Sequence, residues 1–272
     1  MTPITALSIA GSDSGGGAGV QADLRTFSAF GVHATTAITA ITAQNTLAVT
    51  AVSLVDPALV VAQVDAVLSD FAVASVKTGM LGGPATVEAV AALAARARLP
   101  QLVVDPVLVS STGHSLMGEG GVAAYRDALI PHARIVTPNL REAAALCGVD
   151  VEEITSVGDM TELAATIRSW GPDYVLVKGG HLLVREGAPH SPDVLAGAEA
   201  TTILDAPRVA PRNDHGTGCS LSAAICAGLA LGRTVPEAVR DAKSFVLAAL
   251  TAAASWRLGQ GRGPIDHLGW DE

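Results

Sequence analysis

The 272-residue sequence contains three cysteines, an odd number, so no framework of disulfides is expected. Cys219 and Cys226 are seven residues apart on one predicted helix, which separates their backbones by roughly 10 Å, beyond the reach of a disulfide. No Cys-x-x-Cys pair and no Cys/His spacing typical of a metal site occurs. These absences argue against a disulfide scaffold and against structural zinc.

Positive charge is also scarce. The sequence has 17 lysines and arginines and 26 aspartates and glutamates, which gives a formal net charge of −9. Nucleic-acid surfaces need clustered Lys and Arg, so a nucleic-acid partner is not expected. A small anion remains possible, because a few lysines and helix N-termini can hold it locally.

Long hydrophobic runs are missing as well. Residues 26–55 carry no charged side chain, but they are rich in Thr, Ser, Asn and Gln and lack the roughly 20 apolar residues that a membrane-spanning helix needs. The N-terminus has neither the basic nor the long apolar region of a secretory signal. We therefore expect no membrane partner and a cytoplasmic location.

The chain is instead rich in hydrophobic residues, at 49%, with only 3% aromatics, a composition typical of a sheet covered by Ala-rich helices. Short apolar runs alternate with helical periodicity, which predicts an α/β fold with a mostly parallel sheet and helices on both faces. No composition break or repeat divides it, so one domain over 1–272 is expected. Strands are predicted at 4–11, 74–79, 101–106, 133–139 and 174–180, strands with a turn or flap at 32–55, a hairpin at 182–210, and helices at 20–31, after 57, 84–98, 140–148, 160–170, 217–231 and 236–256.

Polar clusters follow most of the predicted strands. In parallel sheets ligands bind outside the carboxyl ends of the strands, so these clusters should gather at one edge and form an active site. The clusters are "GSDSGG", "TGM", "DPVLVSSTG", "TPN" and "KGGH".

The stretch "HGTGCS" is typical of an anion site. Gly216 and Gly218 permit a sharp turn, and a helix from about Thr217 would present free N–H groups to a transferring phosphoryl group. The same helix end should favour thiolate at Cys219. The alternative is an ordinary glycine turn with a half-buried cysteine.

Four further residues are candidates for phosphate or metal binding. Lys178 ends a strand and could neutralise phosphate charge, or be an ordinary exposed lysine. Asn139 and Glu142 lie three apart at a helix start, where the carboxylate could help to hold hydrated Mg²⁺ or simply accompany a helix cap. Asp105 ends a buried strand and could serve the metal–phosphate region or cap a loop.

The first loop, "GSDSGGGAG", lacks the Gly-Lys-Ser/Thr of a Walker A motif and the glycine spacing of a dinucleotide-binding fingerprint. On its own it indicates a tight loop near a ligand. Asp23 lies on the helix that follows. Without a role in ligand binding, it would be an ordinary residue of the polar face of that helix.

Taken together, "IAGSDSGGGAGVQADL", "ITAQNT", "KTGMLG", "DPVLVSSTG", "TPNLREAAAL", "VKGGHL", "HGTGCSLSAA", "AKSF" and "GPIDH" resemble the hydroxymethylpyrimidine/phosphomethylpyrimidine kinases of thiamine biosynthesis, in the ribokinase-like superfamily. The resemblance runs from residue 4 to about 267. It implies a three-layer α/β/α sandwich with a small β flap and dependence on ATP and Mg²⁺. It also implies phosphorylation of 4-amino-5-hydroxymethyl-2-methylpyrimidine and then of its monophosphate, with small molecules as partners and a homodimer formed through the early strands.

The resemblance also assigns residues. In sugar-phosphorylating relatives an aspartate occupies the place that Cys219 takes here, so Cys219 is expected to face the hydroxymethyl oxygen. The expected catalytic set is Gly216, Thr217, Gly218, Cys219 and Lys178, the pyrimidine site Gly11, Asp23, Gln44, Met80 and Val107, the ATP site Asn139, Lys178 and Lys243, and the metal site Asp105 and Glu142.

Two rival functions fit the same residues. A pyridoxal kinase, or a kinase of dual specificity, would act on a similar flat, methylated ring bearing a hydroxymethyl group. A non-catalytic sensor on this fold would be expected to lose Cys219, Lys178 or Glu142, and all three are present. One departure from the family pattern is the pair Ser14 and Gly15 in place of Pro and Ser, which predicts a more mobile first loop.

Overall fold

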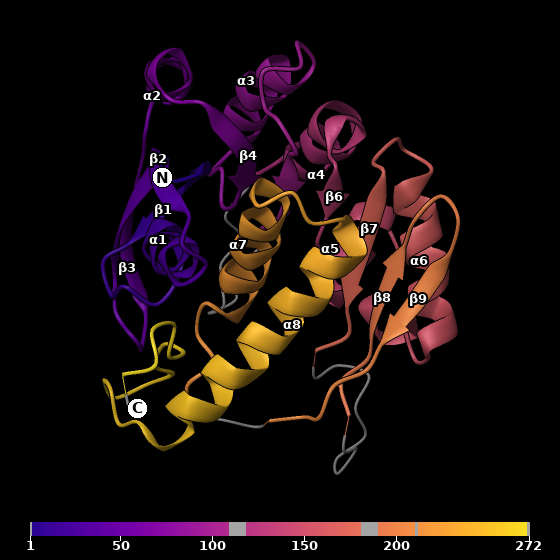
Figure 1. The fold of residues 1–272 in the computed structure, drawn as a ribbon. Coiled ribbons are helices and arrows are strands. Elements are labelled where there is room, and N and C mark those ends of the chain that lie inside the picture. Colours follow the sequence, from indigo (N-terminus) through magenta and orange to yellow (C-terminus); the bar gives the residue numbers. More distant parts are fainter. Residues whose placement is uncertain (1, 109–117, 181–189, 210–211, 271–272) are drawn as a thin grey trace.

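The computed structural model describes residues 2–108, 118–180, 190–209 and 212–270, and within them one nine-stranded sheet has the order β3-β2-β1-β4-β5-β6-β7-β8-β9 (Figure 1). The predicted strands are all found, some of them shorter than expected. The strands are β1 (Thr5–Asp13), β2 (His33–Gln44), β3 (Val49–Leu54), β4 (Val73–Thr78), β5 (Val103–Val104), β6 (Ile135–Val136), β7 (Tyr174–Lys178), β8 (Asp193–Ala196) and β9 (Thr201–Leu204).

The centre of the sheet is parallel and its two edges are antiparallel. Strand β1 pairs in parallel with β2 and β4, and the parallel pairing continues through β5, β6 and β7. Strands β3, β8 and β9 pair antiparallel. Within the segment 32–55, β2 and β3 form a hairpin that continues the main sheet at its edge, with Ala40 opposite Leu54, and its expected role as a small flap stays a prediction. Of the hairpin expected in 182–210, residues 182–189 lie outside the described residues.

Helices connect the strands, as the alternating pattern predicts. The Asp56 carboxylate caps the helix after Pro57, and Gly148, with φ of 70°, ends the helix that follows "TPN". The helix expected over 84–98 stops at Ala94, and Ala97 has a positive φ of 53°. The helices are α1 (Gly19–Ala29), α2 (Pro57–Asp70), α3 (Pro84–Ala94), α4 (Gly121–Ala124), α5 (Leu140–Cys147), α6 (Val157–Arg168), α7 (Thr217–Ala230) and α8 (Val235–Ala252).

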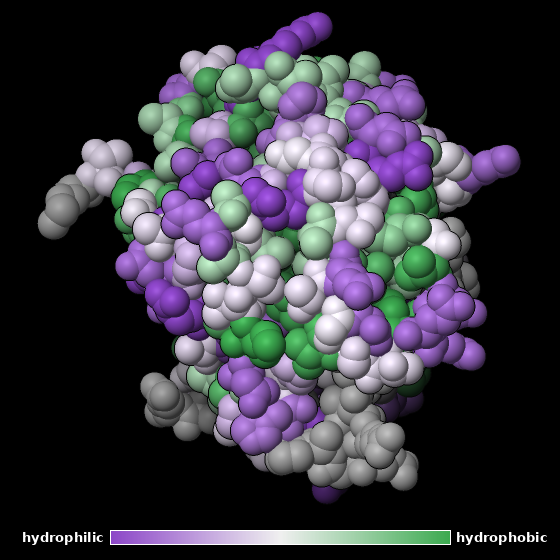
Figure 2. Space-filling model, turned by 90° about the vertical axis from the view of Figure 1, so that its right-hand side faces the viewer, coloured by the Kyte–Doolittle hydropathy of each residue, from purple (hydrophilic) through white to green (hydrophobic). Residues whose placement is uncertain are grey.

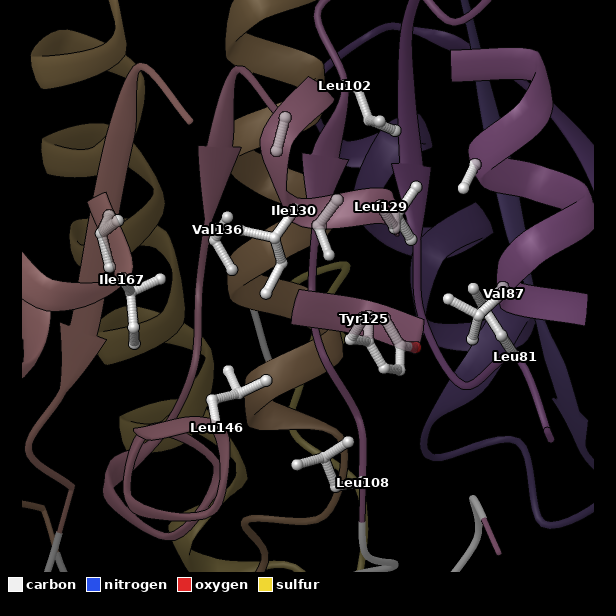
Figure 3. Close-up of a cluster of buried hydrophobic side chains, with 14 of the residues drawn as sticks. Leu81, Val87, Leu102, Leu108, Tyr125, Leu129, Ile130, Val136, Leu146 and Ile167 are labelled. Atoms are coloured by element: carbon white, nitrogen blue, oxygen red, sulfur yellow. The ribbon is translucent and has the colours of Figure 1, made fainter. Parts of the chain in front are cut away.

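Alternate residues of the buried strands face opposite sides of the sheet, which explains why both sides are covered by helices. Val104, Val136 and Val175 belong to a cluster with residues of α2, α3, α5 and α6, and Figure 3 shows part of this cluster around Tyr125, Leu129 and Ile130. These last three come from the helical turns Tyr125–Leu129 and Ile130–His132, which follow α4 directly; sequence patterns did not predict the helical segment 121–132.

The other face is covered by α1, α7 and α8, with α7 and α8 on the near side in Figure 1. Val103, Ile135 and Leu176, the neighbours in sequence of residues in the first cluster, pack there against Ala-rich helix surfaces. The predicted three-layer α/β/α sandwich is therefore confirmed.

The two edges of the sheet differ in their surfaces. On the side of β9 and α6, hydrophobic residues are scattered among hydrophilic ones (Figure 2). The β2–β3 edge carries four large apolar side chains that are 45–59% exposed. They are Ile41, Leu47, Val52 and Leu54. In the described part of the chain, no helix has the length and apolarity to cross a membrane.

Candidate active site

The polar clusters converge at the carboxyl ends of the parallel strands, as predicted. Asp105, after β5, lies with its Oδ1 3.1 Å from Nζ of Lys178 at the end of β7. Ser222 of α7 donates to the other carboxylate oxygen at 3.0 Å, and Thr137, after β6, donates to Oδ1 at 3.2 Å. The carboxylate of Asp105 therefore joins three segments that are far apart in the sequence.

Helix α7 begins beside this network. Gly216 precedes it with φ of 83°, and a Cβ at this residue would lie 1.8 Å from the carbonyl oxygen of Gly17, so only glycine fits. A Cβ added to Gly218 would lie 3.6 Å from Nζ of Lys178. No acidic side chain occupies the first turn, so its N–H groups and the Lys178 ammonium together favour an anion.

The expected thiolate at Cys219 is not supported. Burial raises the pKa of the Cys219 thiol to about 11, and the opposing effects of the Lys77 ammonium and the Gly19 N–H are smaller. Desolvation is the largest effect on this half-buried residue, and the charges of the Asp23 and Asp105 carboxylates raise the pKa of the thiol further. The sulfur is therefore protonated at neutral pH.

A buried ion pair lies beneath Cys219. Nζ of Lys77 contacts both carboxylate oxygens of Asp23 at 2.7 and 2.8 Å, and both side chains are fully buried. Ser8 donates to Asp23 at 2.5 Å. Burial would lower the pKa of Lys77, but the Asp23 carboxylate raises it, so the lysine stays charged.

This pair corrects the expectation that Asp23 lines the pyrimidine site. Its carboxylate is engaged by Lys77 and Ser8 and has no exposed surface. Lys77 itself was missed by sequence reasoning. The available signal was a lysine inside the apolar strand "ASVKTG", where a charge is rare unless it is paired.

Asn139 and Glu142 form a capping box at the start of α5. The Asn139 side chain accepts from the Glu142 N–H at 3.0 Å, and Oε2 of Glu142 accepts from the Asn139 N–H at 2.8 Å. Burial and then Asp105 raise the pKa of Glu142 to about 7, although Lys178 opposes them. The plain alternative, a helix cap, is thus what the structure shows, but Glu142 also lies close enough to Lys178 and Asp105 to be coupled to them.

The carboxylate oxygens of Glu142 and Asp105 are the candidate ligands for Mg²⁺. Mg²⁺ prefers oxygen ligands and usually keeps several waters, so one or two carboxylates suffice. Glu142 uses only Oε2 in the capping box, whereas both oxygens of Asp105 already accept hydrogen bonds. Within the described residues no group of three or more His, Cys, Asp or Glu could hold a metal. The residues fit a hydrated Mg²⁺ at Glu142 better than direct binding by Asp105.

Lys243 does not lie free for an adenine. Its Nζ contacts Oδ2 of Asp193 at 2.5 Å and the carbonyl oxygen of Ser191 at 3.2 Å. Oδ1 of Asp193 in turn accepts from the Gly179 N–H at 3.0 Å. Lys243 therefore supports the turn that follows Lys178, and its expected place on the ATP side stays a prediction.

The first loop is held by Asp13, which sequence reasoning did not single out. Oδ1 accepts from the Gly15 N–H at 2.8 Å, and Oδ2 accepts from Gly17 and Ala18 at 3.1 and 2.9 Å and from His215 at 2.9 Å. Burial alone would raise the pKa of Asp13, but hydrogen bonds from His215 and the backbone lower it below its ordinary value.

The first loop is also joined to the end of β2, while its expected greater mobility stays a prediction. The Ser14 hydroxyl donates to the carbonyl oxygen of Gln44 at 2.7 Å and accepts from the Gln44 N–H at 2.7 Å. The residue that departs from the family pattern thus fastens the loop to the end of β2. Gln44 itself is half-buried beside the first loop.

The remaining expected pocket residues lie near the same strand ends. Gly11 packs closely on Met80, since a Cβ there would lie 2.4 Å from Cε of Met80, and the Thr39 hydroxyl donates to the Met80 carbonyl oxygen at 2.6 Å. Val107 is half-buried two residues after Asp105. Whether these side chains touch a ring stays a prediction.

The C-terminal segment, residues 263–267, contacts the start of α7 and the residues that precede it. Nε2 of His267 lies 2.7 Å from the Ser220 hydroxyl, and a backbone bridge joins His215 to Pro264. Burial lowers the pKa of His267 to about 4, so it is neutral at physiological pH. The motif "GPIDH" is therefore explained by its contacts with the residues on either side of the loop 216–219, here called the anion loop.

Comparisons with known proteins agree with this geometry. The phosphomethylpyrimidine kinase family model matches residues 13–266. The hydroxymethylpyrimidine/phosphomethylpyrimidine kinase of Rhizobium meliloti is 50% identical over 271 residues, covering 98% of each chain. The thiamine biosynthesis bifunctional protein ThiED of Geobacter sulfurreducens is 43% identical over 96% of this chain and 52% of its own length.

Solved structures share the fold. Pyridoxal kinase of Staphylococcus aureus in complex with AMP-PCP and pyridoxal has a TM-score of 0.88 and 32% identity, covering 100% of this chain and 96% of that one. Phosphomethylpyrimidine kinase of Clostridium difficile has a TM-score of 0.78 and 39% identity, covering 90% and 99%.

The buried ion pair gives a prediction for stability. Lys77→Met should lower the free energy of unfolding by about 3–5 kcal/mol, because it leaves the Asp23 charge buried and unpaired. Urea unfolding followed by circular dichroism measures this, and adding Asp23→Asn to Lys77→Met should recover part of the loss. Arg98→Ala, which breaks the exposed pair with Asp65, is the control, with a loss below about 1 kcal/mol. An equal loss in both single variants would contradict the assignment.

The pKa of Cys219 gives a second prediction. Alkylation by iodoacetamide, followed peptide by peptide with mass spectrometry, should be slow at Cys219 at pH 7. It should speed up by about tenfold per pH unit toward pH 10, because the thiolate is the reactive form. Cys226, which is fully buried, is the internal control. A fast rate at Cys219 that does not change above pH 7 would show that it is a thiolate after all.

Proposed function

The chain belongs to the phosphomethylpyrimidine kinase family, and we propose that it phosphorylates 4-amino-5-hydroxymethyl-2-methylpyrimidine and then its monophosphate, with ATP as donor, in thiamine biosynthesis. The single observation that carries this proposal is the meeting of Cys219, the N-terminus of α7 and the Lys178–Asp105 pair at one edge of the sheet. The relatives' names supply the substrate class.

The phosphoryl group would bind at the start of α7. The transition state of phosphoryl transfer is loose and spreads negative charge over the equatorial oxygens, so fixed N–H groups and a nearby ammonium stabilise it. The N–H groups of Gly218 and Cys219 and the ammonium of Lys178 supply these. Asp105 keeps that ammonium charged, since it raises the pKa of Lys178 against the effect of burial.

Glu142 and Asn139 would lie on the nucleotide side. Mg²⁺ would neutralise phosphate charge when bound, and the free oxygen of Glu142 would hold it through its water shell. The structure of the S. aureus pyridoxal kinase with AMP-PCP and pyridoxal supports nucleotide binding on this fold. Asp105, with its lone pairs engaged, would act through Lys178.

Cys219 would orient the acceptor hydroxyl. In the transfer the hydroxymethyl oxygen attacks the γ-phosphorus of ATP, the bond to the β,γ-bridging oxygen breaks to release ADP, and the hydroxyl proton passes to a phosphate oxygen. A thiol with a pKa of about 11 is protonated at rest. It can therefore hold the hydroxyl in line by a hydrogen bond, and a loose transition state needs little base early on.

The pyrimidine would bind near Gln44, Met80, Gly11 and Val107. A carboxamide offers a donor and an acceptor side by side, which suits an amino group next to a ring nitrogen. A pyridoxal kinase, or a kinase of dual specificity, remains the second candidate, because pyridoxal kinases are among the solved structures most similar in shape.

The surface of the β2–β3 edge supports a proposal for the assembly. The four exposed apolar side chains of the β2–β3 edge support a homodimer through this hairpin, since contiguous apolar patches on a surface mark contacts. A single domain spanning 1–272 and a cytoplasmic location complete the proposal, and the continuous sheet supports the former.

The proposal is tested by a product assay. With Mg·ATP, the protein should phosphorylate hydroxymethylpyrimidine and its monophosphate, measured by mass spectrometry of the products, with pyridoxal as a parallel acceptor. Cys219→Ala is the matched variant, and it should lower kcat by about a hundredfold or more with little change in KM for ATP, since positioning is lost. Turnover of pyridoxal alone would contradict the substrate assignment.

A further inference from the structure

His215 is a residue of the "HGTGC" motif to which neither the family resemblance nor the proposed reaction gives a role. Its Nε2 lies 2.9 Å from Oδ2 of Asp13 and 3.2 Å from Nε2 of Gln44. Its side chain is only 13% exposed, and that of Asp13 only 4%. One nitrogen of the ring thus faces two polar groups at once.

The proton on this nitrogen is determined by Asp13. An ionised carboxylate is an acceptor only, and the lowered pKa of Asp13 keeps it ionised. Nε2 of His215 must therefore carry a hydrogen and donate it. A nitrogen that carries a hydrogen cannot accept from the NH₂ group of Gln44, so this arrangement would set two donors against each other.

A half-turn of the Gln44 carboxamide removes the conflict. Its oxygen then faces the single Nε2–H of His215, which it shares with Oδ2 of Asp13, and its NH₂ group moves to the place near the Thr42 hydroxyl, 3.3 Å away. The Thr42 hydroxyl already donates to the Ser12 carbonyl oxygen at 2.9 Å, so it can accept from that NH₂ group but cannot donate a second time. Both neighbours of Gln44 select the same orientation.

The surrounding glycines keep the His215 ring in place. A Cβ at Gly17 would lie 2.4 Å from Cδ2 of His215, so the first loop packs directly on the ring. The backbone N–H of His215 donates to the Gly263 carbonyl oxygen at 3.0 Å. The backbone of Gln44 is fixed separately, by Ser14.

We propose that His215, held by Asp13, is a positioning residue that fixes the orientation of the Gln44 carboxamide and so selects an acceptor with an amino group beside a ring nitrogen. This inference rests on the proposed function. In the selected orientation, Gln44 has one N–H and one oxygen lone pair left for a ligand. An aminopyrimidine presents the complementary acceptor and donor on adjacent atoms, whereas pyridoxal has no amino group next to its ring nitrogen.

The test compares His215→Phe with His215→Gln, alone and combined with Gln44→Ala. Phe removes the donor, whereas Gln places an N–H near the position of Nε2. His215→Phe should raise KM for hydroxymethylpyrimidine by about tenfold, as expected for one lost hydrogen bond at a buried polar site. KM for ATP should stay within about twofold, and His215→Gln should restore most of the affinity for the acceptor.

The combined variant separates positioning from a general structural effect. Because His215 acts through Gln44, adding His215→Phe to Gln44→Ala should leave KM for the pyrimidine unchanged. A further increase in the combined variant, or a parallel rise in KM for ATP, would overturn the inference and leave the proposed function intact. A wild-type protein that does not phosphorylate hydroxymethylpyrimidine would overturn both.

Discussion

The carboxylate of Asp13 is the interaction on which the arrangement of the site depends. It gathers three N–H groups of the first loop and the ring of His215, which directly precedes the anion loop. The backbone of Gly17 also approaches Gly216 so closely that no side chain fits at the latter, so the same two loops meet at both points. Residues about 200 positions apart in sequence are thereby brought into contact.

Three Asp–Lys pairs near the strand ends determine the electrostatics of the site. Asp23–Lys77 is fully buried, and Asp105–Lys178 and Asp193–Lys243 are largely buried. Each pair brings a positive charge close to the strand ends while its carboxylate offsets the cost of burying that charge. Cys219 lies among them as a neutral thiol, because enclosure affects its pKa more than the neighbouring lysine does. The preference of this edge for an anion comes instead from the start of α7, whose first turn has no acidic side chain, together with the Lys178 ammonium.

The sequence predicted the order of strands and helices and the edge at which function gathers, because apolar periodicity and glycine turns are local signals. It did not predict the helical segment 121–132 or the roles of Lys77, Asp13 and His215. Those roles arise from partners 54, 4 and 202 residues away in the pairs Lys77–Asp23, Asp13–Gly17 and His215–Asp13. Even the close partner of Asp13 needs the loop to be folded, and the same reason explains why the expectations for Asp23 and for a thiolate at Cys219 needed correction.

The most direct test of this account is Asp13→Asn, assayed for kcat/KM with the pyrimidine acceptor. An amide in this place sets a donor against the N–H groups of the loop or His215, so kcat/KM should fall by about a hundredfold. Asp159→Asn is the control, since Asp159 also accepts backbone N–H groups, from Thr155 and Ser156, but at the exposed start of α6. It should leave kcat/KM unchanged. An Asp13→Asn protein as active as the wild type would show that the two loops do not need this carboxylate to form the site.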